Sequence, residues 1–151
     1  MKKMQIVVSD FEAYKHPFPI GSILYIECEN RCFPDYRWVD LTSEVLERWL
    51  NIMTGLLYGA NDRVNLEFMD GDYSMRLTRG GKDSINAIWI EHKKEIAAFD
   101  NIALLYFCRQ LLAAATQIMN HAQKEGDQHT AFHISEQLLT FRNAYQKVKQ
   151  S

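Results

Sequence analysis

The pattern of hydrophobic and polar positions predicts two strands at the start of the chain. Residues 4–9 (MQIVVS) and 22–29 (SILYIECE) are rich in the side chains that favour strands. Between them, residues 10–21 contain Pro17 and Pro19, and two prolines this close prevent regular ladder hydrogen bonding. We therefore expect a long loop there, and a second irregular segment at residues 30–40 (NRCFPDYRWVD).

A helical repeat follows at residues 41–62. Val45, Trp49, Ile52 and Leu56 recur at three- and four-residue spacing, which indicates an amphipathic helix with a wide apolar stripe. Thr42 is expected to be the N-cap, and Gly59 is a typical residue at a helix end.

Strict alternation then predicts a hairpin over residues 63–78. With Asp70-Gly71 as a two-residue type I′ loop, Val64 faces Leu77 and Leu66 faces Met75, so one face is wholly apolar. A slip of one residue would destroy this match. On this reading the carboxylates of Asp70 and Asp72 belong to the turn. Residues 84–92 are expected to add a third strand.

The last third of the chain has the helical period. Residues 100–127 are expected to form one long helix that begins at Asp100 and ends at Gly126. Residues 130–150 form a second, amphipathic helix, and the short connection implies an antiparallel pair. The predicted fold is α+β: a mainly antiparallel sheet of about five strands with three helices, the last two a helical hairpin.

Composition narrows the class of protein. A chain of 151 residues with 47% hydrophobic and 24% charged residues is typical of a single folded domain, here residues 1–151. No apolar run approaches the length that spans a bilayer, and a cytoplasmic location is expected. The net charge of −2 argues against general nucleic-acid binding. Three cysteines are expected to be free thiols.

Negative charge is concentrated between Glu27 and Glu47, where six acidic residues stand against two basic ones. Such a patch can attract a basic partner and raise its association rate. The simpler interpretation is that these acids lie on a solvated loop and at the start of a helix, where negative charge interacts favourably with the helix dipole. The candidate partner-binding residues in this segment are Asp35, Tyr36, Trp38, Asp40, Glu44 and Glu47.

Candidate chemistry is sparse. His129 and His133 are four residues apart and could share a helical face, with His121 preceding them, but the glutamate of the HExxH pattern is missing. Asp70 and Asp72 could hold a divalent ion beside Glu67, yet such loops normally supply more oxygen ligands. We therefore predict no catalytic residues, no metal and no cofactor.

Two stretches support a family resemblance. Residues 33–57 (FPDYRWVDLTSEVLERWLNIMTGLL) and 66–77 (LEFMDGDYSMRL) resemble small bacterial proteins in which a Trp-x-Asp segment leads into a Trp-containing helix and an FMDG-x-Tyr hairpin follows. Those proteins are similar to immunity proteins of polymorphic or contact-dependent toxin systems. The matching positions are Trp38, Asp40, Trp49, Asp70, Gly71 and Tyr73, in stretches that cover about a quarter of the chain.

The resemblance implies a stoichiometric inhibitor of a cognate toxin domain, a nuclease being one possible target, and carries over no catalytic residues. The match is incomplete, since a proline often follows the hairpin glycine in that group and Asp72 stands here. Two other functions stay open: a small metal-dependent hydrolase, and an oligomeric ligand-binding module that uses the long helix.

Overall fold

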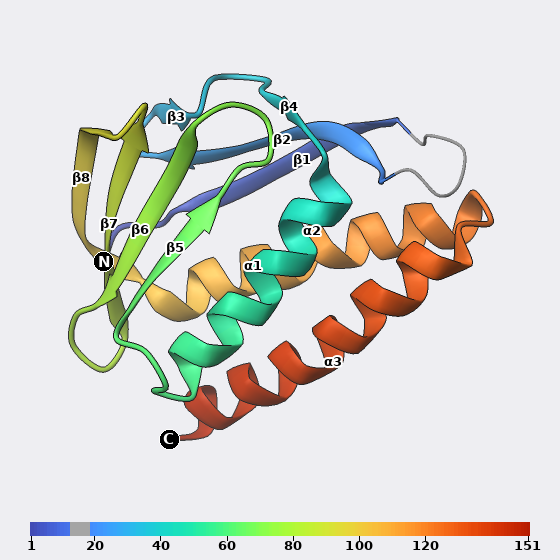
Figure 1. Cartoon of the computed structure of the whole chain (residues 1–151). Helices are drawn as coiled ribbons and strands as arrows, with labels where there is room; N and C mark the ends of the chain where they lie inside the picture. Colours follow the sequence, from blue (N-terminus) through green and yellow to red (C-terminus); the bar gives the residue numbers. More distant parts are fainter. Residues whose placement is uncertain (13–18) are drawn as a thin grey trace.

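The computed structural model describes residues 1–12 and 19–151, which form three helices and two antiparallel sheets (Figure 1). The predicted loop at residues 10–21 therefore lies partly outside the described residues. In chain order the elements are β1 (Gln5–Glu12), β2 (Gly21–Cys28), β3 (Arg31–Phe33), β4 (Val39–Asp40), α1 (Thr42–Leu57), β5 (Arg63–Glu67), β6 (Tyr73–Arg79), β7 (Ser84–Glu91), β8 (Lys94–Ala103), α2 (Leu104–Lys124) and α3 (Gln128–Gln150).

The α+β class, the antiparallel pairing and the helical hairpin are confirmed, but the prediction of one sheet of about five strands is wrong. In the first sheet β2 pairs with β1, β3 and β4, and in the second the order is β5-β6-β7-β8. The prediction missed β3 and β4, which span only three and two residues, and β8, in which buried and exposed positions do not alternate regularly. A two-residue strand carries too little alternation to be recognised.

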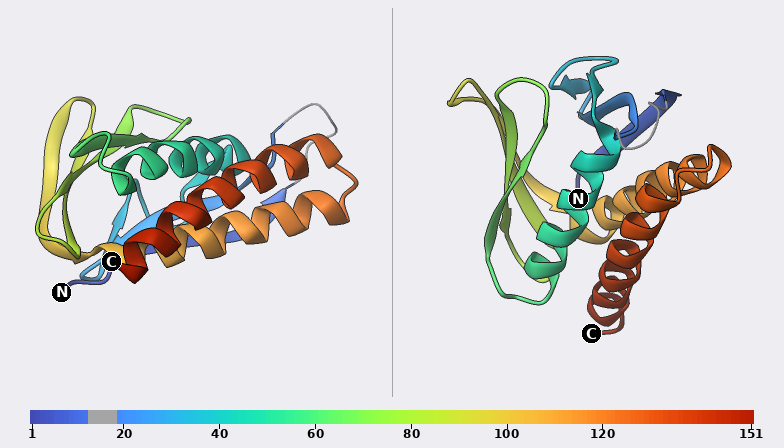
Figure 2. Two further views of the ribbon diagram at one scale, coloured as in Figure 1. Left: turned by 90° about the horizontal axis from the view of Figure 1, so that it is seen from below. Right: turned by 45° about the vertical axis from the view of Figure 1, so that its right-hand side comes forward.

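The helices lie together on one side of the sheets. Figures 1 and 2 show α2 and α3 side by side and antiparallel, with α1 between them and the second sheet. α1 packs against α3, α2 and β5, and β1 lies against α2. One cluster of buried side chains joins all these layers, including Leu24 of β2, Trp89 of β7, Leu46 of α1, Phe107 of α2 and Phe141 of α3.

Phe33 joins the two sheets. Its ring stacks on Trp89 at 5.1 Å between ring centroids and meets Phe68 and Tyr73 edge-on at 5.7 and 6.0 Å. The side chain is fully buried. Aromatic pairs of this geometry add to the stabilisation that burial provides. The loop that follows Phe33 is therefore held against the second sheet.

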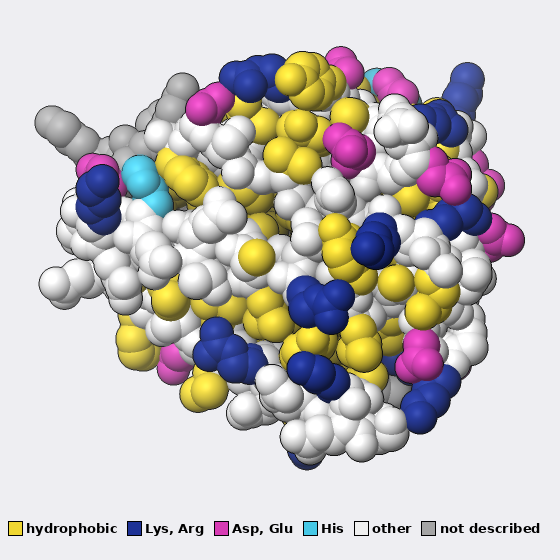
Figure 3. Space-filling model, turned by 180° about the vertical axis from the view of Figure 1, so that it is seen from behind, with side chains coloured by type: hydrophobic (Ala, Val, Ile, Leu, Met, Phe, Trp, Pro, Cys, Tyr) yellow, Lys and Arg dark blue, Asp and Glu magenta, His cyan; other side chains and the backbone are white. Residues whose placement is uncertain are grey.

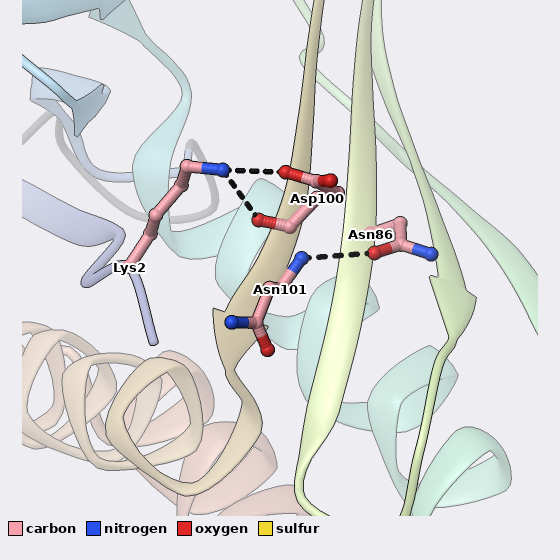
Figure 4. Close-up of polar contacts among 4 residues, drawn as sticks. All are labelled: Lys2, Asn86, Asp100 and Asn101. Carbon is pink, nitrogen blue, oxygen red and sulfur yellow. Dashed lines mark hydrogen bonds and ion pairs between the residues drawn. The ribbon is translucent and has the colours of Figure 1, made fainter.

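The predicted helix start at Asp100 is wrong, because β8 continues to Ala103. The register between β7 and β8 shifts between Ile85 and Ala87. Asn101 has φ 54° there, and its amide donates to the side-chain oxygen of Asn86 at 3.0 Å (Figure 4). This bulge places Asp100 beside Lys2, whose Nζ contacts the carboxylate at 2.5 Å. The bulge and the ion pair thus give Asp100 a strand role that helix periodicity does not reveal.

The ends of α1 follow the prediction only in part. Gly59 follows the C-cap residue Tyr58 and has φ 79°, as a glycine at a helix C-terminus should. Thr42, however, is the first helical residue, and no side chain caps the helix. Its hydroxyl instead lies 2.5 Å from that of Ser22, in a buried contact between α1 and β2.

Candidate functional site

The residues of the two resembling stretches meet at a single buried carboxylate. Asp40, only 3% exposed, ends β4, and its oxygens accept hydrogen bonds from the Leu41 amide at 2.7 Å and the Trp38 indole at 3.1 Å. They also accept from the Met69 and Asp70 amides at 3.2 and 3.3 Å. Asp40 therefore ties the β3–β4 loop to the β5–β6 hairpin.

These bonds explain why the predicted turn type is wrong although the strand register is right. Val64 faces Leu77 and Leu66 faces Met75, as alternation predicts. Yet only Gly71 has a positive φ in the turn, whereas type I′ requires two such residues. Phe68 donates its amide to the Tyr73 carbonyl at 3.1 Å, so the loop is four residues long. The Asp40 carboxylate accepts hydrogen bonds from two backbone amides of this wider loop.

Aromatic packing completes the junction. The Trp38 and Tyr73 rings meet edge-on at 4.9 Å, and Gly71 lies against both. A Cβ at Gly71 would be 2.7 Å from the Tyr73 ring, which is too close for any other residue without movement. Trp49, fully buried in α1, donates its indole N–H to the Glu67 carbonyl at 2.9 Å.

The matching positions therefore have structural roles. Trp38, Asp40 and Trp49 are engaged within the fold, and Asp70 and Gly71 form the turn that they hold. The sequence analysis includes Trp38 and Asp40 among the candidate partner-binding residues. In the structure both side chains hold the two loops together, and we infer that they support the surface that these loops form.

That surface carries three exposed hydrophobic side chains. Tyr36 is 64% exposed, Val39 54% and Met69 37%. Val39 pairs with Ile23 on β2, and Tyr36 packs edge-on against Tyr25 at 5.7 Å. Eight residues of these two loops are exposed, among them Arg37, Gly71 and Asp72; we call the other five, Asp35, Tyr36, Val39, Met69 and Asp70, the tip surface.

The tip surface is partly concave and acidic. A shallow pocket of about 280 Å³ lies between Val39, Leu41, Met69 and Asp70. Asp35 and Asp70 form no ion pair with any described residue, whereas Asp10 pairs with Arg37 at 2.7 Å. Figure 3 shows hydrophobic side chains near the upper edge of the face seen from behind, among charged ones of both signs.

Glu44 and Glu47 lie elsewhere, so the predicted acidic patch is divided between two places. Both line a pocket of about 220 Å³ between the starts of α1 and α3, together with His129 and His133. Burial raises the pKa of Glu47, and the nearby His133 and His129 oppose that effect. Glu44 forms an ion pair with Arg48 at 3.3 Å. No pattern in the sequence indicates that α1 and α3 bring these groups together.

The histidines do not converge as one cluster. The rings of His129 and His133 are 4.3 Å apart, while His121 stacks on Phe11 of β1. Across residues 1–12 and 19–151, no group of three or more His, Cys, Asp or Glu side chains is placed to hold a metal ion.

The three cysteines are free thiols, as expected. Burial raises the pKa of Cys108 to about 12 and also raises the pKa of Cys28 and Cys32. None of these changes activates a thiol as a nucleophile, because each favours the protonated form.

Val39 and Met69 are the functional candidates that the sequence reasoning did not select. A signal for Met69 was present, since the hairpin register puts it on the otherwise polar face. Val39 gave no such signal, because its strand is only two residues long.

Comparisons with family models, curated proteins and solved structures found no match to the chain. Among the helices of the described part, none is both long enough and apolar enough to cross a bilayer.

Proposed function

We propose that this chain is an immunity protein, which binds a cognate bacterial toxin domain and neutralises it by stoichiometric inhibition. The observation that carries the proposal is the tip surface, where exposed Tyr36, Val39 and Met69 lie beside Asp35 and Asp70, which form no ion pair with any residue that the structure describes. Exposed aromatic and Met side chains are enriched where proteins bind each other, and they often dominate the binding energy.

The charge of this surface suits a basic target. A toxin that cleaves nucleic acid presents a basic site, and acidic side chains around an apolar centre can occupy it. In this proposal the apolar side chains supply affinity, while Asp35 and Asp70 supply orientation and fast association. The inhibitor would act in the cytoplasm, where such a toxin meets its substrate.

The support beneath the surface favours tight binding. The Asp40 hydrogen bonds and the packing of Phe33, Trp38 and Tyr73 hold both loops in one arrangement. A surface that is ordered before binding loses less conformational entropy when the complex forms. In this proposal the residues shared with the immunity-protein group are buried because they hold the binding loops in place.

The proposal predicts that the neighbouring upstream gene encodes a large secreted protein with a toxic C-terminal domain. Expression of that domain alone should stop bacterial growth, and co-expression of this chain should restore it. The absence of such a gene, or a domain that stays toxic in the presence of this chain, would contradict the proposal.

Two substitutions by lysine test the position of the interface in the same growth assay. Met69→Lys should abolish rescue, because it places a positive charge against a basic partner. Leu139→Lys is the matched control, since Leu139 is 59% exposed on α3, away from the tip surface. Equal rescue by both variants would exclude the tip surface as the interface.

A further inference from the structure

A third pocket lies where α1 ends, at the opposite end of that helix from β4. Figure 1 shows the end of α1, the β6–β7 turn and the C-terminal end of α3 gathered at one end of the molecule. The cavity between the end of α1, the segment that follows it and the β6–β7 turn has a volume of about 450 Å³ and is lined by both glycines of the turn and by Tyr58, Asp62, Arg79 and Lys82. Pockets for small ligands usually measure about 300–1,000 Å³.

Arg79 is the most informative residue of this cavity. It is half-buried, and its Nη2 donates to the Lys82 carbonyl at 3.1 Å. No carboxylate of the described residues lies within ion-pair distance of it, although Asp62 lines the same cavity. A guanidinium has five donor hydrogens, and partly desolvated charges are normally paired. Its remaining donors therefore suit an anionic ligand.

Two lysines add to this positive charge. Lys82 is an exposed residue of the lining, and the Lys147 ammonium lies 5.3 Å from the centre of the Tyr58 ring. The lining itself holds two cations, Arg79 and Lys82, and one acid, Asp62, and Lys147 adds a third cation beside the Tyr58 ring, in a chain whose net charge is −2. The excess of positive charge is local and is not a general property of the surface.

Tyr58 supplies a planar wall. Its ring is 51% exposed, and the neighbouring Gly59 has no atom within 4 Å of where its Cβ would be. A flat aromatic group can stack on such a ring beside the lysine.

The backbone of the β6–β7 turn does not contribute as a phosphate loop does. The Gly80 and Gly81 amides donate to the carbonyl and the hydroxyl of Ser84, at 2.9 and 3.0 Å. Binding must therefore come from the side chains of Arg79 and Lys82, with Lys147 beside them at the Tyr58 ring.

We propose that this cavity binds a nucleoside phosphate, with the phosphates at Arg79, Lys82 and Lys147 and the base stacked on Tyr58. Arginine suits this role because its fork can donate two parallel hydrogen bonds to one phosphate. The assignment is independent of the proposed inhibition, since the tip surface is formed by other elements at the other end of α1.

The probe is ATP, titrated calorimetrically into the full chain at low ionic strength, with tripolyphosphate as the ligand that lacks a base. Saturable ATP binding is expected, and Arg79→Gln should weaken it at least about tenfold. Tyr58→Leu should weaken ATP binding severalfold but leave tripolyphosphate binding unchanged. Lys93→Gln, which removes an exposed charge at the β7–β8 turn, is the control and should change neither affinity by more than about twofold.

Lys82→Gln is the second test of the phosphate contact, because Lys82 is exposed and the substitution keeps the backbone carbonyl that accepts from Arg79. It should weaken the binding of both ligands. Absence of saturable ATP binding would overturn the proposal, as would ATP affinity that is unchanged in both Arg79→Gln and Lys82→Gln. A Tyr58→Leu variant that binds ATP like the unaltered chain would also overturn it.

Discussion

Replacing Asp40 by alanine should destabilise the protein more than replacing any exposed acid. The substitution removes the acceptor for four donors: the Trp38 indole and the amides of Leu41, Met69 and Asp70. The carboxylate is 3% exposed, so little water is available to take its place without movement of the loops. Both loops that it joins should loosen together.

The size of the effect follows from these contacts. A hydrogen bond to a charged group contributes about 1.5–3 kcal/mol, and a donor left unpaired costs about 1–3 kcal/mol. The longer bonds, at 3.2 and 3.3 Å, go to amides of the exposed hairpin loop, which water can reach once that loop has moved. Counting mainly the Trp38 and Leu41 bonds, we expect a loss of about 3–4 kcal/mol in the free energy of unfolding.

Urea unfolding followed by tryptophan fluorescence measures this loss. With an m-value of about 2 kcal/mol/M, the midpoint should fall by about 1.5–2 M. Asp70→Ala is the matched control, because that carboxylate is exposed, and it should change stability by no more than about 0.5 kcal/mol. A loss below about 1 kcal/mol for Asp40→Ala would refute the idea that this carboxylate holds the loops together.

Three further predictions concern other positions. Burial raises the pKa of Glu47 above 4.5, so the folded state holds that proton more tightly than the unfolded state, and stability falls as pH rises through the range just above 4.5. Glu47→Gln should therefore raise the free energy of unfolding, measured with urea, by more at pH 7 than at pH 4. An equal increase at both pH values would contradict this reasoning. Gly71→Ala should cost about 1–3 kcal/mol in the same assay, because its φ is 79° and its Cβ would meet the Tyr73 ring, and an unchanged midpoint would contradict the geometry. Iodoacetamide at pH 8 should label half-buried Cys32 in the folded protein but Cys108, with its pKa near 12, only after denaturation, as mass spectrometry would show.

The sequence predicted those parts of the fold that depend on local periodicity. Alternation gave the register of Val64 with Leu77 in the hairpin, and helical spacing gave α1 and α3. It did not give the two tight turns at Glu29-Asn30 and His92-Lys93, whose four residues all have positive φ. Neither pair contains the glycine by which such turns are usually recognised.

The candidate site was predicted less completely because it depends on contacts between distant segments. Asp40 was grouped with exposed acids, although its partners Met69 and Asp70 are 29 and 30 residues away. Glu47 was read as part of a surface patch, whereas α3 brings His129 and His133 beside it. Single-sequence patterns carry no information on which polar group will be buried by a remote loop.

The most direct test of the account is the dissociation constant between this chain and the toxic domain encoded upstream, measured for Tyr36→Ala. We predict a loss of at least about 2 kcal/mol, or roughly 30-fold in affinity, because Tyr36 is the aromatic side chain of the tip surface and is 64% exposed. Phe132→Ala, which truncates a similarly exposed aromatic residue on α3, should bind like the unaltered chain. Unchanged affinity for Tyr36→Ala, or an equal loss for Phe132→Ala, would contradict the assignment of the tip surface.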